Sequence, residues 1–251
     1  MKLTTNLKKL LNQPDTLSEI FHQKTKINKY TQDTLNPPKW PREWKTLYFK
    51  AYSRLDEVTL PTLDNINTIK LKDALIQRKS SRIFTKRLSL SQIGTLLYYS
   101  SGINKNKHFN EPYRFYPSAG ARYPLELYII SLRSNLPSGL YHYYVKNHSL
   151  EVLLRMEKFD FNKYLLQKAF NKCSVLIIIT AVFQRNLMKY GDRGYRYILI
   201  EAGHVGQNIY LLSSALNLNC CAVGGFVDDS LNNLLHIDGL HESVLYVFAV
   251  G

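Results

Sequence analysis

The chain has 251 residues, of which 45% are hydrophobic and 21% are charged. This length suits one domain with a substantial core, and the composition is that of an ordinary soluble globular protein. The longest apolar runs, Val175–Ile179 and Val244–Val250, have the length of strands, whereas a bilayer-spanning helix needs about 20 apolar residues. The first residues are basic and polar, which predicts no signal peptide, no membrane partner and a cytoplasmic location.

Lysine and arginine outnumber aspartate and glutamate by 33 to 19, which gives a net charge of +14. Such an excess favours anionic partners, such as a nucleic acid, a phosphorylated cofactor or an acidic peptide. However, the basic residues are scattered, and eight of the 18 tyrosines fall in predicted strands or in the predicted buried helix. A nucleic-acid-binding protein is therefore a minor alternative, and we expect no nucleic-acid partner.

The cysteines and histidines show no pattern of a disulfide framework or a metal site. The three cysteines are odd in number, which predicts buried thiols. No Cys-x-x-Cys motif occurs, and the histidines lack zinc-type spacing, so we expect no metal. His204 lies in a mostly apolar segment and is interpreted as a core histidine.

Residues 1–66 hold five of the nine prolines and several isolated aromatic residues, which predicts an N-terminal arm packed on the main domain. Within it, Leu17–Gln23 predicts a short helix, because Thr16 and Glu19 have the spacing of a capping box. The main domain is expected over residues 67–251. Its first helices are predicted at Leu71–Lys79 and Ser89–Ser101, the second capped by Ser89 or Ser91 and ended by Gly102.

The remaining elements predict helices around a mostly antiparallel sheet, hence an α+β class. Strands are expected at Leu125–Leu132, Gly139–Val145, Leu150–Leu154, Val175–Val182, Cys220–Val223 and Val244–Val250, and the β-branched run Val175–Val182 is expected to be central. Helices are expected at Phe161–Phe170, Tyr195–Leu216 and Asp229–Leu235. The second of these is apolar on nearly all sides, which predicts burial, in part against a second subunit. No Gly-x-Gly-x-x-Gly motif follows a strand, which counts against a Rossmann site.

Two segments have the composition of a site for a phosphorylated or flat ligand. Arg78-Lys79-Ser80-Ser81-Arg82 places three cations and two hydroxyls after a helix, and these can surround a phosphate or form an ordinary solvated turn. Small residues in Tyr116-Pro117-Ser118-Ala119-Gly120-Ala121 let the backbone approach a flat ligand, although a plain loop has the same composition.

Two further segments lie toward the C-terminus. The glycines in Ala222-Val223-Gly224-Gly225-Phe226 permit a similar close approach after a strand, or a simple turn. Met188–Tyr197 contains Lys189 and Tyr190, which can transfer protons if their pKa values are shifted. The alternative for Met188–Tyr197 is a loop that initiates a helix.

In this order, the segments resemble the SagB-type (ThcOx-like) dehydrogenases of the nitroreductase superfamily. The resemblance covers about residues 67–251, and the arm is similar only loosely, through Phe21–Thr25. The matching stretches are Arg78–Arg82, Pro117–Ala121 running into Tyr123–Tyr128, Gly139–Tyr143, Lys189–Tyr197, Glu201–Val205 with Gln207 and Asn208, and Gly224–Phe226 with Asp228 and Asp229.

This resemblance implies the nitroreductase fold in an obligate homodimer, with FMN at the subunit interface and the long helix in the dimer core. It implies that the phosphate and ribityl chain are bound by Arg78, Lys79, Ser80 and Arg82. The isoalloxazine would be lined by Pro117, Ser118, Ala119, Gly120 and Ala121 from the partner subunit. Further flavin contacts would come from Gln207, Asn208, Gly224 and Gly225.

The resemblance also implies an activity, the oxidation of thiazoline or oxazoline rings in a ribosomal peptide to thiazoles or oxazoles. The implied partners are the azoline-containing peptide and a cyclodehydratase. Lys189 is expected to be the general base, its pKa lowered by burial and by Arg193, while Tyr190 orients the ring or relays the proton. The alternatives are an NAD(P)H-dependent nitro- or quinone reductase, and the same fold acting on a non-peptide substrate.

Overall fold

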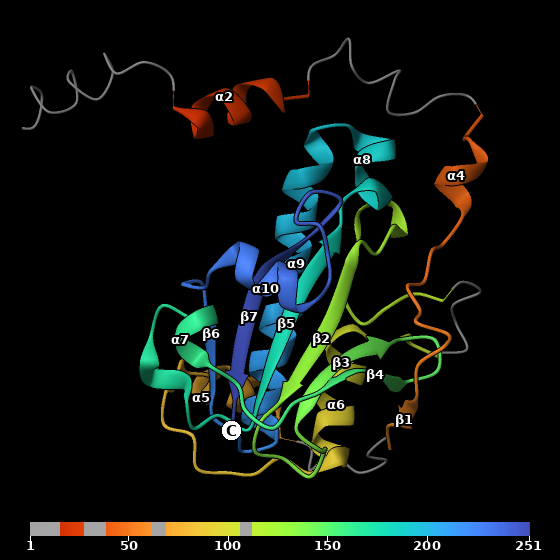
Figure 1. Ribbon diagram of the computed structural model, residues 1–251. Coiled ribbons are helices and arrows are strands. Elements are labelled where there is room, and N and C mark those ends of the chain that lie inside the picture. The colour runs from red at the N-terminus through yellow and green to blue at the C-terminus, as the bar shows by residue number, and fades with distance from the viewer. Residues whose placement is uncertain (1–15, 28–38, 62–68, 106–111) are drawn as a thin grey trace, which may run out of the picture.

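In the computed structural model, which describes residues 16–27, 39–61, 69–105 and 112–251, one sheet runs through the molecule and helices cover both its faces (Figure 1). Its strands are β1 (Glu57–Thr59), β2 (Leu125–Ser131), β3 (Gly139–Tyr144), β4 (Ser149–Arg155), β5 (Val175–Val182), β6 (Cys220–Val223) and β7 (Glu242–Val250). They lie in the order β1-β4-β3-β2-β5-β7-β6, and each neighbouring pair is antiparallel. The predicted α+β class is confirmed.

The run Val175–Val182 forms the inner strand β5, between β2 and β7, as predicted. Its side chains alternate between two hydrophobic cores, with Ile177 and Ile179 on one face and Leu176 and Ile178 on the other. Because helices cover both faces of the sheet, the strand is apolar at every position but Thr180 instead of alternating with polar residues.

Two long helices, α6 (Leu90–Ser101) and α9 (Arg193–Ala215), cover one face and lie behind the sheet in Figure 1. Of the two predicted caps, Ser89 is the one that caps α6, and the helix ends at Gly102 as predicted; the capping box that Ser89 forms with Gln92 was not predicted. A Cβ atom at Gly206 of α9 would lie 2.6 Å from Cζ of Phe248, so glycine is needed for this close helix–sheet contact.

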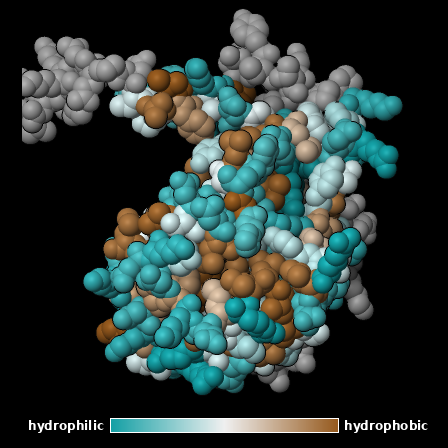
Figure 2. All heavy atoms as spheres, viewed as in Figure 1, coloured by the Kyte–Doolittle hydropathy of each residue, from teal (hydrophilic) through white to brown (hydrophobic). Residues whose placement is uncertain are grey.

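The opposite face carries the short elements α7 (Phe161–Tyr164), η3 (Lys168–Phe170) and α10 (Asp228–Leu234). The prediction of one helix over Phe161–Phe170 is wrong. After Tyr164 the backbone pairs with another segment instead, because Leu165 forms a β-bridge with Phe226 and the Leu166 N–H donates to Gly225 O at 3.0 Å. Hydrophobic side chains gather in the middle of this face, surrounded by polar ones (Figure 2).

The other helical elements are α2 (Leu17–Lys24), α4 (Arg42–Lys45), α5 (Leu71–Gln77), η2 (Ala119–Ala121) and α8 (Gln184–Tyr190). The capping box of Thr16 and Glu19 is confirmed at the start of α2. The pattern does not predict α8, because its buried side chains are polar or charged and give no apolar periodicity; they are Arg185, Asn186 and Lys189.

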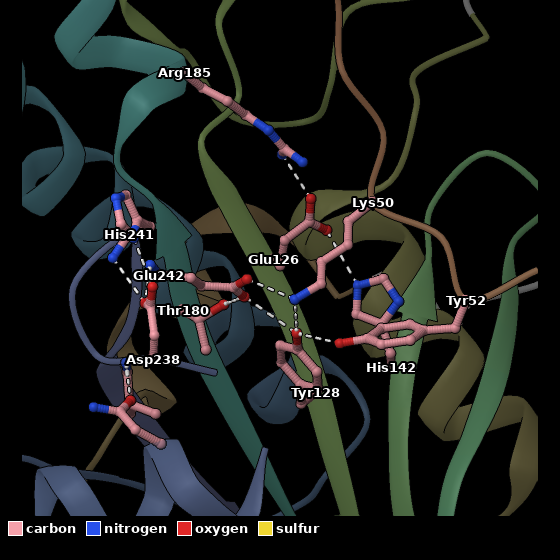
Figure 3. A network of polar contacts seen from close by, with 12 residues as sticks. Lys50, Tyr52, Glu126, Tyr128, His142, Thr180, Arg185, Asp238, His241 and Glu242 are labelled. Carbon is pink, nitrogen blue, oxygen red and sulfur yellow. Dashed lines mark hydrogen bonds and ion pairs between the residues drawn. The ribbon is translucent and has the colours of Figure 1, made fainter. Parts of the chain in front are cut away.

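The described part of the arm is attached to the sheet by buried polar contacts (Figure 3). Lys50 Nζ lies 2.5 Å from the Glu242 carboxylate and 2.6 Å from the Tyr128 hydroxyl. The Tyr52 N–H donates to Glu151 at 2.5 Å, and β1 extends the sheet beside β4. The segment from Lys50 to β1 therefore packs on the sheet. The other described arm segment, residues 16–27, contacts the start of α9, because Arg193 donates to Thr25 O. Arm residues 1–15, 28–38 and 62–66 lie outside the described ones.

Within the single chain, α9 has an exposed face, so its complete burial, in part against a second subunit, stays a prediction. Leu199 is 44% exposed and Ile200 is 55% exposed, and His204 lies on the same exposed face instead of in the core. The apolar composition of this face therefore has no explanation within one chain. Among the described residues, no helix is both long and apolar enough to cross a membrane.

Candidate active site

The four chemically distinctive segments fall into two groups at different positions along α9. Lys189 and Tyr190, at the end of α8, meet the loop Pro117–Ala121 beside Glu201 of α9. The basic segment Arg78–Arg82 follows α5 and lies beside β6. In Figure 1, α8 lies at the top of the molecule and α5 at the bottom.

The loop that carries η2 has an unusual backbone. Gly120, Ala121 and Tyr123 have φ values of 60°, 53° and 47°. Positive φ at residues other than glycine costs about 1–3 kcal/mol and persists only where the surroundings hold it. Two hydrogen bonds hold this loop: the Tyr123 N–H donates to Ser118 Oγ at 2.9 Å, and the Ala119 N–H donates to Glu201 at 3.0 Å. Strain of this kind concentrates at functional sites.

Gly120 brings this loop against the predicted catalytic pair. A Cβ atom added there would lie 2.5 Å from the Tyr190 hydroxyl oxygen and 3.0 Å from Lys189 Nζ. The structure thus joins two segments that are about seventy residues apart in the sequence. Any larger residue at position 120 would therefore force these two side-chain ends to shift.

Lys189 is only 6% exposed, and among the described residues its amine has no carboxylate within ion-pair distance. Burial, followed by the nearby positive charge of Arg122, lowers its pKa. The predicted direction is confirmed, but the predicted cation is wrong. The Arg193 guanidinium turns away to donate to Thr25 O at 2.9 Å, because the arm offers it a carbonyl.

Aromatic rings surround the Lys189 amine. The nitrogen lies 3.6 Å from the centre of the Trp40 ring, 5.4 Å from that of Trp44 and 5.3 Å from that of Tyr190. Both tryptophans belong to the arm, at and before α4. Ring faces attract a cation without the strong hold of a carboxylate.

A cavity of about 750 Å³ lies beside this cluster. Its walls are the strained loop and the residues before it, together with Trp40 from the arm. The lining residues are Trp40, Asn104, Tyr113, Arg114, Phe115, Tyr116, Pro117, Ser118, Gly120, Ala121 and Tyr123. A second cavity, of about 360 Å³, is lined by Lys189, Tyr190 and Trp44. The pair therefore lines one cavity and contacts the wall of another at Gly120, and both cavities are large enough for small-molecule groups.

Glu201 supports the loop from α9 and is 2% exposed. Its Oε1 accepts hydrogen bonds from the Ala119 N–H and from Asn186 Nδ2 at 3.0 and 3.2 Å, while its Oε2 has no hydrogen-bond partner among the described residues. Burial raises the pKa of Glu201 to about 7 despite these donors. Glu201 is therefore partly protonated near neutral pH. The pKa of Tyr190 is raised by burial, and the nearby Tyr197 and Glu201 raise it further.

Arg122 joins the three elements of the site. It is 2% exposed and donates to Arg185 O at 3.1 Å, to Trp44 O at 2.5 Å and to Glu43 O at 2.9 Å. The loop, α8 and α4 are thus held together by one guanidinium, which fixes the arm beside Lys189.

The second group lies around Tyr210 of α9. Its hydroxyl is 2.8 Å from Ser80 Oγ and accepts the Ala222 N–H at 2.8 Å, and its ring lies 5.4 Å from the Arg78 guanidinium. Ser80 also forms a β-bridge with Cys220. Within the described residues no carboxylate pairs with Arg78, Lys79 or Arg82, so their charges are available to an anion.

The remaining predicted ligands divide between the two groups. Asn208 donates to Ser100 O and Phe115 O, each at 3.3 Å, and so anchors the residues before the strained loop. Gln207 is exposed. A Cβ atom at Gly224 would meet nothing within 4 Å, and one at Gly225 would meet only Leu166. The edge after β6 is therefore open to a ligand.

These arrangements agree with comparisons to known proteins. The model of the nitroreductase family matches residues 75–251. The chain belongs to the nitroreductase family. It is 35% identical to MJ1384 of Methanocaldococcus jannaschii, named as a nitroreductase, over 72% of this chain and 90% of that protein. A crystal structure named as a nitroreductase of Anabaena variabilis covers 94% of this chain with a TM-score of 0.69 and 26% identity, and this chain spans 46% of it. The predicted nitroreductase fold is confirmed.

Two further relatives of this nitroreductase-family chain are named for peptide processing. The chain is 27% identical to the microcin B17-processing protein McbC of Escherichia coli, over 50% of this chain and 49% of McbC. It is 26% identical to the trifolitoxin-processing protein TfxB of Rhizobium leguminosarum bv. trifolii, over 65% of this chain and 47% of TfxB. The chain thus spans about half the length of these two relatives.

Replacing Gly120 by alanine tests the contact that defines the site. The new Cβ collides with the Tyr190 hydroxyl at a positive φ, so we expect a stability loss of about 1–3 kcal/mol. Displacing the pair by about 1 Å is also expected to lower turnover by about 10²-fold. Gly239→Ala is the matched control, because Gly239 has a φ of 71° and its Cβ would lie 2.9 Å from Asn232 Nδ2, away from the pair.

Denaturant unfolding and turnover assays of both variants separate strain from catalysis. Gly239→Ala is expected to lose stability and keep turnover, whereas Gly120→Ala loses both. Equal turnover in the two variants would contradict a functional contact at Gly120.

The sequence did not single out several residues that build the site. Trp40 and Trp44 appear only as isolated aromatics in the arm, and Arg122 lies just outside the matched stretch Pro117–Ala121. Glu201 lies in a matched stretch, but nothing local assigns it a role. A buried charge in an otherwise apolar helix is the signal that sequence offers for Glu201.

Proposed function

We propose that this chain is an FMN-dependent dehydrogenase that oxidises thiazoline or oxazoline rings of a ribosomal peptide to thiazoles or oxazoles. The observation that carries the proposal is the Lys189–Tyr190 pair against the Gly120 loop, beside the cavity of about 750 Å³. A buried amine with a lowered pKa and no carboxylate partner in the described part of the chain suits a general base at neutral pH.

The reaction removes two hydrogens from the azoline ring. The proton leaves the carbon next to the imine, and we assign Lys189 Nζ as its acceptor. When bound, FMN supplies the acceptor for the hydride. Tyr190, whose hydroxyl faces the same loop backbone as Lys189, orients the ring or relays the proton. The strained loop and Trp40 form the walls that position the ring and limit water around the base.

The relatives support this substrate class. McbC and TfxB are named for processing microcin B17 and trifolitoxin, and the matching stretches of the sequence resemble SagB-type dehydrogenases. The fold also occurs in the Escherichia coli microcin synthetase McbBCD complex with truncated pro-MccB17 bound, at a TM-score of 0.57 and 20% identity. We therefore propose a peptide substrate and a cyclodehydratase partner for this chain.

The basic group around Tyr210 fits the phosphate end of FMN. Arg78, Lys79 and Arg82 have no carboxylate partner among the described residues, and Ser80 adds a hydroxyl. Guanidinium groups match a phosphate dianion in geometry and charge. We propose that this group binds the phosphate and ribityl chain, while Gly224 and Gly225, at the open edge after β6, contact the flavin.

A homodimer would complete this site. Glu201 lies at the loop and Tyr210 lies in the basic group. The two residues are nine positions apart on α9, which corresponds to about 13 Å of helix. Leu199 and Ile200 give α9 an exposed apolar face near the loop. If the α9 helices of two subunits pack through this face, the loop Pro117–Ala121 of one subunit can approach the basic group of its partner. We propose this shared arrangement, with Gln207 and Asn208 beside it.

An NAD(P)H-dependent nitro- or quinone reductase is the second candidate, favoured by the 35% identity to MJ1384, which is named as a nitroreductase. The two candidates differ in what reduces the flavin. We expect an azoline peptide to bleach the flavin absorbance in the absence of oxygen, and NAD(P)H to do so more slowly. Rapid bleaching by NAD(P)H, with none by the azoline peptide, would favour the reductase and contradict our proposal.

A further inference from the structure

The contacts of Lys189 involve a part of the chain to which neither the sequence nor the family match assigns a role. Trp40 lies outside the matched residues 75–251, yet its ring centre is only 3.6 Å from Lys189 Nζ. The next nearest ring centres are those of Tyr190 and Trp44, at 5.3 and 5.4 Å. Among the described residues, Trp40 is therefore the closest ring to the amine by a wide margin.

The packing of the arm makes this contact specific. Trp44 is fixed on α8 by its indole N–H, which donates to Met188 O at 3.2 Å, and the Trp44 and Glu43 carbonyls accept from Arg122. The Trp40 and Trp44 rings meet edge to face, with centres 6.2 Å apart. Trp40, 40% exposed, is thus held over Lys189 by its neighbours and lies at the boundary between the site and solvent.

The charges around Lys189 explain what such a ring contributes. Arg122 repels the ammonium, and Arg185, four residues earlier on α8, is paired with Glu126 at 2.6 Å. Arg193 is bonded to the arm carbonyl of Thr25. Tyr190 is the neighbouring titratable group on α8. Burial raises its pKa, and Tyr197 and Glu201 of α9 raise it further.

Since no carboxylate in the described part of the chain pairs with Lys189, the protonated amine depends on ring faces for its stabilisation. A cation over a ring gains about 0.5–2 kcal/mol, whereas breaking a buried carboxylate pair costs about 3–5 kcal/mol. A ring therefore stabilises the ammonium after proton transfer without preventing the amine from losing the proton again.

We propose that Trp40 is a positioning residue for Lys189, so that the N-terminal arm forms part of the active site and stabilises the base in its protonated form. The inference rests on the proposed function in one respect, because it takes Lys189 as the proton acceptor. It goes beyond that function by giving the arm a chemical role.

The test compares Trp40→Phe with Trp40→Leu, because the new side chains are similar in size and only phenylalanine presents a ring face. The purified full-length protein, with its flavin, is labelled by reductive methylation over a range of pH values. Mass spectrometry of the peptide containing Lys189 gives the pH at which that amine loses its proton. Lys163, an exposed lysine 5.3 Å from the Tyr164 ring centre, is the internal control in the same sample.

We expect the labelling midpoint of Lys189 to lie lower in Trp40→Leu than in Trp40→Phe, so that labelling below the midpoint is about three- to tenfold faster. The midpoint of Lys163 is expected to be the same in both variants. If Trp40 only shields Lys189 from solvent, the two variants will share one midpoint or Trp40→Leu will have the higher one, and either result would overturn the inference.

This measurement needs no substrate, so its failure is distinguishable from that of the proposed function. If the protein does not oxidise an azoline peptide but shows the midpoint difference, the role of Trp40 is supported and the proposed function is contradicted. If the protein oxidises the peptide through Lys189 but shows no midpoint difference, the proposed function is supported and the role of Trp40 is contradicted.

Discussion

Replacing Lys189 by alanine is expected to lower azoline turnover by about 10²-fold or more while FMN stays bound, which is the usual loss for a removed acid–base catalyst. Lys189 is 6% exposed and shares the Gly120 contact with Tyr190, so the substitution removes the amine from the reacting position. The basic group around Tyr210 is untouched, so flavin content should not change. Turnover of an azoline peptide, per bound flavin, gives the measurement.

Lys163→Ala is the matched control for this experiment. Lys163 also lies over an aromatic ring, that of Tyr164, but it is exposed and distant in sequence from the site. We expect turnover in this variant to equal that of the wild type. Unchanged turnover in Lys189→Ala would contradict the assignment of Lys189 as the general base.

Glu201→Gln is expected to stabilise the protein at alkaline pH. The pKa of this carboxyl is raised to about 7 in the fold by burial, against about 4.3 in an unfolded chain. Between these values the folded state binds a proton that the unfolded state has lost. Stability therefore falls as pH rises from about 4.3 to about 7, and levels off above that.

The size of the effect follows from the shift. Each pKa unit corresponds to about 1.4 kcal/mol, so a shift from about 4.3 to about 7 makes the cost of ionising Glu201 about 3–4 kcal/mol at most. Glutamine is neutral and keeps an oxygen for the Ala119 N–H. We expect Glu201→Gln to be about 2 kcal/mol more stable than the wild type at pH about 8, and the difference to shrink toward pH about 5.

Glu126→Gln is the matched control, since Glu126 is also 2% exposed but has the opposite shift. Burial alone would raise its pKa, but Arg185 and His142 together lower it to about 2. Glutamine there leaves Arg185 without its buried partner, at a cost of about 3–5 kcal/mol at neutral pH. Denaturant unfolding at several pH values compares the two variants. If Glu201→Gln were less stable than the wild type at alkaline pH, the claim that the ionised Glu201 carboxylate destabilises the fold would be contradicted.

Much of the fold follows from local patterns in the sequence. The apolar run of β5, the capping box at Thr16, the cap of α6 at Ser89 and the length of α9 are all set by nearby residues, and the structure has them where expected. The errors arise where a contact with a distant segment determines the local backbone conformation. Leu165 leaves the helical conformation because it pairs with Phe226.

The candidate site was predictable as separate segments but not as an assembly. Small residues and cations mark Pro117–Ala121 and Arg78–Arg82, yet nothing in the sequence shows that Gly120 meets Lys189. The approach of Trp40 to Lys189 joins residues 149 positions apart, and single-sequence periodicity contains no information on such pairs. Helix α8 was also not predictable, because its buried side chains are polar or charged and helix prediction relies on an apolar face.

The most direct test of the account is a single turnover without oxygen. The flavin-loaded protein is mixed with an azoline-containing peptide, and the flavin absorbance and the peptide mass are followed together. Our account predicts that the flavin bleaches while the peptide loses two hydrogen atoms per ring, with one ring oxidised for each flavin reduced. A flavin that stays oxidised beside an unchanged peptide, while NAD(P)H bleaches it, would contradict azoline oxidation by this chain.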